Sequence, residues 1–279
     1  MPSDQIDAHH HLWKYSSKDY PWMSEGMEAI RCDFLVDDLH QTLSEAGING
    51  AVTVQARQTL IETDWLLQLA SASKIVRGVV GWVPLVKSRV HDDLERLASN
   101  KKLKAVRHVI HDEPDNFFIL REDFNRGIAL LERFKLKYDI LIFERHLPQT
   151  IAFVDRHPEQ IFVVDHIAKP RIKDGDMEPW RRALADLARR QNIYCKLSGM
   201  VTEANWSSWT ESELQPYVDV VLTAFGPKRI MFGSDWPVLL VASSYKGWVE
   251  TVHRMIRSLS DDEQQWIMGQ TAKMVYELD

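Results

Sequence analysis

Short runs of apolar residues alternate along this chain with longer segments in which apolar positions recur every three or four residues. The short runs have the length of strands and are apolar at nearly every position, which is typical of strands covered on both faces. We predict strands at 6–8, 50–55, 76–83, 103–108, 138–142, 161–165, 193–197 and 229–233. The helical period predicts helices at 36–46, 63–73, 90–99, 124–135, 148–157, 180–190 and 214–225.

Strict alternation of strand and helix indicates parallel strands joined by helical crossovers. Eight such units favour an α/β fold closed into a (β/α)8 barrel, the TIM barrel. A doubly wound open sheet would carry a glycine-rich phosphate-binding turn after its first strand, and the sequence has none there. Because no linker or repeat divides the pattern, we predict one domain over 1–279, with insertions at 13–33 and 198–213 that cover the barrel mouth.

Composition narrows the classes of partner. The 279 residues are 45% hydrophobic and 27% charged, as in ordinary globular proteins, and the net charge is −6. Without a dense basic run, the chain lacks the electrostatic footprint of a nucleic-acid-binding protein. No apolar stretch reaches the roughly 18 residues of a membrane span, and no signal peptide is evident. We therefore expect a cytoplasmic protein with no nucleic-acid or membrane partner; whether it forms a homo-oligomer is open.

Two motifs near opposite ends of the chain carry the strongest chemical signal. His9, His10 and His11 follow the first predicted strand, and Asp235 follows the last. In a closed barrel these strands are neighbours, so the motifs would share one pocket at the carboxyl ends of the strands. On an extended strand His9 and His11 point the same way and His10 the other, which suits two imidazoles converging on one ion or one substrate oxygen. The alternative for Asp235 alone is a turn or helix cap.

Other polar residues follow the remaining strands. Asp165 and His166 end the sixth strand, where a surface turn is the alternative reading, and Trp236 is a candidate wall of the pocket. Candidates to bind substrate at the ends of strands two, four, five and seven are Gln55, Arg57, Arg107, His108, His146, Lys196 and Glu203. The alternatives are packing on the barrel rim for Arg107, pairing with a carboxylate for Lys196, and exposed-loop roles for Gln55, Arg57 and His146.

Five blocks of sequence, taken together, resemble the amidohydrolase-2 group of the amidohydrolase superfamily. They are the His9 and His11 pair and the segments 54–59, 165–170, 195–204 and 232–237, and the similarity spans nearly the whole chain. The most similar branch is that of the sugar lactonases, which includes L-fuconolactonase and L-rhamnonolactonase. The resemblance implies a (β/α)8 barrel of carbohydrate metabolism that hydrolyses the ester of a cyclic aldonolactone to the open acid.

The resemblance also implies a set of metal ligands. His9, His11, His166 and Asp235 match ligand positions of the superfamily on strands one, six and eight, and would hold one divalent ion, with zinc as the first candidate. Strand four offers Arg107 where the superfamily has Lys or Glu, and strand five ends without His, so we expect no two-metal centre. A metal-free site, in which the imidazoles with Arg107 or Lys196 polarise the lactone carbonyl, stays open as the alternative.

These residues suggest a mechanism and two rivals. In our hypothesis Asp235 is the general base for the attacking water and then protonates the ring oxygen, while His9, His11 and His166 stabilise the oxyanion. One rival is an amidohydrolase-2 type decarboxylase of an aromatic or unsaturated acid. The other is a catalytically silent barrel that serves as a binding or scaffold protein. The polar candidates at the mouth favour a hydroxyl-rich small molecule as the substrate.

Overall fold

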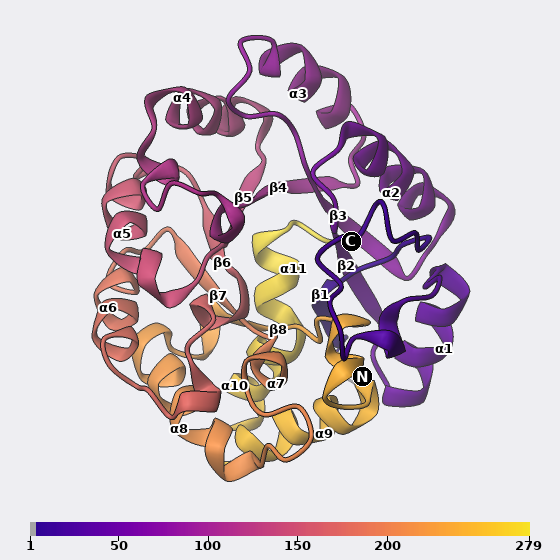
Figure 1. Ribbon diagram of the computed structural model, residues 1–279, viewed down its shortest axis with the longest axis vertical. Helices are drawn as coiled ribbons and strands as arrows, with labels where there is room; N and C mark the ends of the chain where they lie inside the picture. The colour runs from indigo at the N-terminus through magenta and orange to yellow at the C-terminus, as the bar shows by residue number, and fades with distance from the viewer. Residues whose placement is uncertain (1–3) are drawn as a thin grey trace.

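Eight parallel strands form a barrel in the computed structural model, which describes residues 4–279 (Figure 1). The strands pair in chain order, from β1 to β8. They are β1 (Ile6–His10), β2 (Gly50–Val54), β3 (Val76–Gly81), β4 (Leu103–Val109), β5 (Lys137–Leu141), β6 (Phe162–Val164), β7 (Ile193–Leu197) and β8 (Ile230–Phe232). The predicted (β/α)8 barrel is confirmed. Residues 1–3 lie outside the described residues, and they begin the N-terminal segment in which the sequence shows no signal peptide.

The barrel closes between β1 and β8 just beyond the end of β8. His10 forms a parallel bridge with Trp236, the backbone N–H of Asp235 donates to the carbonyl of His9 at 2.7 Å, and the N–H of His11 donates to the carbonyl of Trp236 at 2.6 Å. The closing hydrogen bonds therefore run through the two motifs that the sequence singled out. Backbone pairing, and not side-chain attraction alone, holds the motifs against each other.

Most of the helices surround the strands in Figure 1. The helices of the described residues are α1 (Val36–Ala46), α2 (Leu60–Ala72), α3 (Val90–Ala98), α4 (Glu122–Leu131), α5 (Leu147–Asp155), α6 (Trp180–Leu187), α7 (Met200–Glu203), α8 (Glu211–Phe225), α9 (Tyr245–Met255), α10 (Asp261–Gln265) and α11 (Thr271–Val275). Helix α2 begins three residues before its predicted start because Thr59 caps it, accepting the N–H of Glu62 at 3.2 Å. Helix α4 ends before its predicted end because a 3-10 turn follows it and Lys135 adopts a left-handed conformation, with φ of 57°.

The last helix crosses the end of the barrel opposite the mouth. In Figure 1, α11 (yellow) lies at the centre of the ring of strands, and it contacts β1 and β8. Its residues Ala272 and Val275, with Tyr276 and Leu278, pack against inward-facing strand residues such as Val80 in a cluster of their own. We call this cluster the floor. The helices after Phe225 were not among those predicted from sequence.

The two predicted insertions differ in structure. Segment 13–33 has a small core in which Trp13, Tyr20, Met23 and Ile30 are buried, and it packs against the loop after β8. Segment 198–213 contains α7. Among the described residues no helix is both long and apolar enough to span a membrane.

Candidate metal-binding and hydrolytic site

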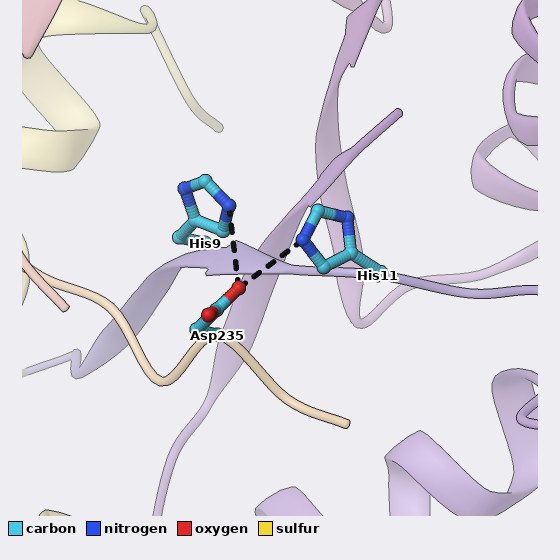
Figure 2. Close-up of side chains that lie close together, drawn as sticks. All are labelled: His9, His11 and Asp235. Atoms are coloured by element: carbon cyan, nitrogen blue, oxygen red, sulfur yellow. Dashed lines mark hydrogen bonds and ion pairs between the residues drawn. The ribbon is translucent and has the colours of Figure 1, made fainter. Parts of the chain in front are cut away.

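His9, His11 and Asp235 converge at the seam between β1 and β8 (Figure 2). The Nε2 atom of His11 lies 3.2 Å from Oδ1 of Asp235, and Nε2 of His9 lies 3.7 Å from the same oxygen. All three residues are buried, and His9 is fully inaccessible. The predicted convergence of the two ends of the chain is thus present in the structure.

An irregularity in β1 sets the direction of these side chains. The pairing of β1 with β2 shifts register between Asp7 and His10. Ala8 belongs to the floor cluster and His9 also points inward, so two consecutive residues face the barrel interior, as at a β-bulge. Beyond the shift the expected alternation holds: the ring of His10 turns outward and its Nε2 contacts the hydroxyl of Thr53 at 2.9 Å, while His11 turns back inward.

His166 completes the set from the loop after β6. Its Nε2 lies 3.9 Å from Oδ1 of Asp235, and its Nδ1 contacts the hydroxyl of Ser198 at 2.8 Å. The loop backbone is left-handed at four consecutive non-glycine residues, 166–169, which is a strained arrangement. Gly199 provides the room, because a Cβ there would lie 2.5 Å from Nδ1 of His166. We name His9, His11, His166 and Asp235 the imidazole cluster.

The hydrogen-bond partners of His11 indicate that the imidazole cluster suits a cation. The Nδ1 of His11 lies 2.8 Å from the carbonyl oxygen of Val54, so Nδ1 carries a proton and donates it. In the neutral ring, the lone pair of Nε2 then faces a carboxylate oxygen of Asp235, which is also an acceptor. A proton or a metal cation between the two atoms satisfies both.

Burial keeps the neighbouring rings neutral. It lowers the pKa of His166 to about 4 and that of His9 well below its usual value. Burial by itself would raise the pKa of Asp235, but the nearby His166 and His11 outweigh it and the pKa falls below the ordinary value. Neutral imidazoles around an ionised carboxylate are the protonation states that ligate a divalent metal ion. Two overlapping sets of described residues have ligand atoms close enough for an ion, namely His9, His11 and Asp235, and His9, Asp165 and His166.

A layer of paired charges lies directly beneath this cluster. Lys196 contacts Asp139 at 2.5 Å and Asp165 at 3.0 Å, and Arg107 contacts the other oxygen of Asp165 at 2.9 Å. These four residues, which we name the inner ion layer, are at most 3% exposed. Burial would raise the pKa of Asp165, but Lys196, His9 and Arg107 outweigh it and hold the pKa well below the usual value. Oδ1 of Asp165 lies 3.3 Å from Nδ1 of His9, which links the layer to the imidazole cluster.

The predicted substrate-binding residues lie in three different surroundings. Gln55, Arg107 and Lys196 lie together inside the barrel, where Arg107 donates to the backbone carbonyl of Gln55 and Lys196 approaches His9 at 3.3 Å. Trp236 is buried at the seam and packs edge-on against Phe34. The others have partners outside the imidazole cluster. Arg57 pairs with Asp19, His108 with Glu113, His146 with Asn116, and Glu203 with Lys169.

Three buried carboxylates organise this region; sequence reasoning did not select Asp7 and Asp139, and it named Asp165 only together with His166. Asp139 and Asp165 belong to the inner ion layer, and Asp7 accepts hydrogen bonds from the backbone of His9 and Ser234 and from the hydroxyls of Ser234 and Tyr245. Burial raises the pKa of Asp7 to about 6 despite these bonds. The available signal was a charged residue within an otherwise apolar strand, which marks a paired or functional group.

Comparisons with known proteins agree with one another. The family model described as Amidohydrolase matches residues 6–278. An L-fucono-1,5-lactonase of Burkholderia multivorans is 40% identical, over 100% of this chain and 97% of its own length. An L-fucono-1,5-lactonase of Burkholderia ambifaria is 35% identical, over 99% and 96%. The crystal structure of an amidohydrolase from B. multivorans with bound zinc superposes with a TM-score of 0.94 at 40% identity, covering 99% of each chain.

Proposed function

This chain belongs to the amidohydrolase family, and from that premise we propose that it hydrolyses a sugar lactone to the open aldonic acid. The observation that carries the proposal is the placement of Asp235 among three imidazoles at the mouth of the barrel. L-Fucono-1,5-lactone, the substrate in the names of two full-length relatives, is the first compound to test.

The residues of the imidazole cluster would divide the reaction between them. Asp235 is ionised, and its Oδ1 accepts a proton from the attacking water while the water oxygen bonds to the lactone carbonyl carbon. The ester bond to the ring oxygen then breaks, and Asp235 returns the proton to that oxygen. The product is a hydroxy acid, which loses one proton to the solvent at neutral pH. Asp235 thus serves as the base in the first step and the acid in the second.

His9, His11, His166 and Asp235 would also hold a divalent ion, which we propose to be zinc. The donor set fits, because three neutral nitrogens and one carboxylate satisfy the four-ligand preference of zinc, and Nε2 of His11 needs a cation or proton to face Asp235. Such an ion would lower the pKa of a nearby water toward neutrality and polarise a carbonyl. The water would then give up its proton even to a weak base such as Asp235, whose pKa is lowered.

One side chain near the inner ion layer is suited to bind substrate. Gln55 is fully buried, its amide nitrogen approaches the carbonyl of Arg107 at 3.4 Å, and its Oε1 has no hydrogen-bond partner among the described residues. An unsatisfied buried acceptor is costly, and a sugar hydroxyl that donates to Oε1 would relieve this cost. Arg107, in contrast, donates from its terminal nitrogens to Asp165 and to the backbone carbonyl of Gln55, so we propose that it positions the site and does not bind substrate.

The test is a panel of aldonolactones with a pH indicator, together with elemental analysis of the purified protein. A lactonase releases one proton per turnover, a decarboxylase releases carbon dioxide from an acid without opening a ring, and a silent scaffold turns over neither kind of compound. Opening of L-fucono-1,5-lactone with about one zinc per chain would support the proposal. Absence of proton release over the whole panel, with the protein folded and zinc present, would overturn it.

A further inference from the structure

A tyrosine from the floor of the barrel reaches the inner ion layer from below. Tyr276 follows α11 and is fully buried. Its hydroxyl lies 2.9 Å from each carboxylate oxygen of Asp139. An ionised carboxylate can only accept hydrogen bonds, so the Tyr276 hydroxyl donates its single proton in this contact.

The contact continues through paired charges to the imidazole cluster. Asp139 accepts from Lys196 at 2.5 Å, and Lys196 also holds Oδ1 of Asp165 at 3.0 Å. The same Oδ1 lies 3.3 Å from Nδ1 of His9. Nδ1 of His9 also lies 3.3 Å from Nζ of Lys196, which can only donate, so the balance between Lys196 and Asp165 decides which ring nitrogen of His9 carries the proton. A proton on Nδ1 pairs with Asp165 and leaves the lone pair on Nε2 facing Asp235, which is the tautomer that a metal ligand requires.

Basic residues near the starts of strands hold the segment that carries Tyr276. Lys104 of β4 donates to the backbone carbonyl of Glu277 at 2.9 Å, and Lys137 of β5 pairs with the Glu277 side chain. On the other side, Lys273 of α11 pairs with Asp4 at 2.8 Å. Tyr276 therefore enters the barrel from a segment that is fixed on both sides. Its hydroxyl is thus held in one position and can orient the carboxylate of Asp139.

We propose that Tyr276 is a positioning residue for the hydrolytic site, acting through Asp139, Lys196 and Asp165 on the orientation of His9. This inference rests on the proposed lactonase function for its kinetic test and on the proposed metal site for its binding test. Loss of the hydroxyl leaves Asp139 with Lys196 as its side-chain partner in the layer, so the ammonium moves toward Asp139 and loosens its hold on Asp165. The ring of His9 then loses its fixed orientation.

The test compares Tyr276→Phe with Tyr138→Phe. Tyr138 is an adequate control because it is also fully buried and lies next to Asp139 on β5, but it packs outward among Phe124, Phe153 and Phe162. Outer partners of metal ligands typically contribute about 10-fold to 100-fold to affinity or activity. Since Tyr276 lies further from the metal ligands, we expect Tyr276→Phe to lower both kcat and zinc affinity about threefold to tenfold, with KM within about twofold.

Zinc affinity is measured by competition with a chromophoric chelator, and kcat and KM on the best lactone of the panel. A double-mutant cycle adds Asp139→Asn: if Tyr276 acts through Asp139, the double variant is no worse than Asp139→Asn alone. A general loss of packing would instead lower the thermal midpoint without separating kcat from KM. Should Asp139→Asn fail to fold, the comparison of zinc affinity and kcat between Tyr276→Phe and Tyr138→Phe still tests the proposal.

The inference is overturned if Tyr276→Phe matches Tyr138→Phe in both zinc affinity and kcat, or if the effects of Tyr276→Phe and Asp139→Asn simply add. A wild-type protein that opens no lactone refutes the proposed function and leaves the zinc competition to decide the role of Tyr276. A wild-type protein that opens lactones but binds no zinc leaves the decision to kcat and the cycle.

Discussion

The imidazole cluster and the inner ion layer are adjacent, buried and both built around carboxylates, yet their charges are balanced in different ways. In the inner ion layer, Asp139 and Asp165 are matched by Lys196 and Arg107. In the imidazole cluster, Asp235 faces the rings of His9 and His166, whose pKa values burial lowers so that both rings are neutral. The layer has its counter-charges within the protein, whereas the cluster leaves one carboxylate for a cation or proton to match.

This difference separates support from chemistry. A buried pair whose partner is removed leaves an uncompensated charge and destabilises the fold. A carboxylate that faces neutral imidazoles is instead available for proton transfer or metal binding. Substitutions in the layer should therefore act first on stability, and substitutions in the cluster first on activity.

Asp235→Asn should have the largest effect on activity. We expect kcat to fall by at least about 10³-fold, because the amide is not a base and general-base catalysis alone contributes about 10²-fold to 10⁴-fold. The fold should persist, since Asn tolerates the left-handed backbone of this position, with φ of 61°, and keeps the backbone bond to His9. Kinetics on the best lactone and thermal unfolding check both parts; substantial retained activity would reject Asp235 as the base.

Removal of a bound metal ion should also lower the activity of the imidazole cluster. Dialysis against a strong chelator is expected to lower lactonase activity by about 10²-fold or more, because an ion supplies both water activation and charge stabilisation. Zinc added back should restore it. Because a ligand that binds only the folded state stabilises by RT ln(1 + [L]/Kd), zinc should also raise the unfolding free energy by about 3 to 4 kcal/mol at 100 to 1,000 times its Kd. Full activity in metal-free protein would favour the metal-independent alternative.

Lys196→Met should act on the inner ion layer and lower stability. The substitution removes the cation shared by Asp139 and Asp165 while keeping an unbranched side chain, so we expect a loss of about 3 to 5 kcal/mol in urea unfolding. The matched control is Lys169→Met, because Lys169 lies 2.6 Å from Glu203, close to the 2.5 Å between Lys196 and Asp139, but in a partly exposed pair. This control should cost about 1 kcal/mol or less. Equal losses in the two variants would remove the distinction between the layer and an ordinary ion pair.

Much of the fold and of the imidazole cluster was predictable from sequence for one reason. Apolar strands and helical crossovers alternate along the chain, and a barrel of parallel strands brings the residues that follow its strands to one end. His11, His166 and Asp235 follow β1, β6 and β8, and His9 lies near the carboxyl end of β1, so topology brings them to the same end of the barrel. The roles proposed for them in catalysis remain predictions until the variants are measured.

The partners inside the barrel were not predictable in the same way. Arg107 was expected to bind substrate or to pack on the barrel rim, and Lys196 to face the mouth or pair with a carboxylate. Both in fact pair with Asp165 or Asp139, and this pairing depends on packing across the barrel. The register shift in β1 also leaves no local pattern. Likewise, periodicity indicates that a helix has an apolar face but not which surface it covers, so the docking of α11 on the floor could not be foreseen.

A buried carboxylate outside both the layer and the cluster extends the comparison and should give the smallest effect. Glu62 of α2 is 3% exposed and accepts hydrogen bonds from the backbone N–H groups of Ala56 and Arg57, while its other oxygen has no hydrogen-bond partner among the described residues. Burial, only partly offset by these bonds, raises the pKa of Glu62 from 4.5 to about 7. The folded state therefore binds this proton more tightly than the unfolded state does.

The sign of the pH dependence follows from that difference. The contribution of Glu62 to stability is fully present below pH 4.5 and is lost as pH rises to about 7, because the unfolded state ionises first. Glu62→Gln stays neutral and can still accept the two backbone hydrogen bonds, so it should stabilise the protein at pH 8 by about 1 to 3 kcal/mol and change little at pH 5. Urea unfolding at the two pH values measures this. An equal effect at both would mean that Glu62, like Asp165 of the inner ion layer, has its charge compensated within the fold.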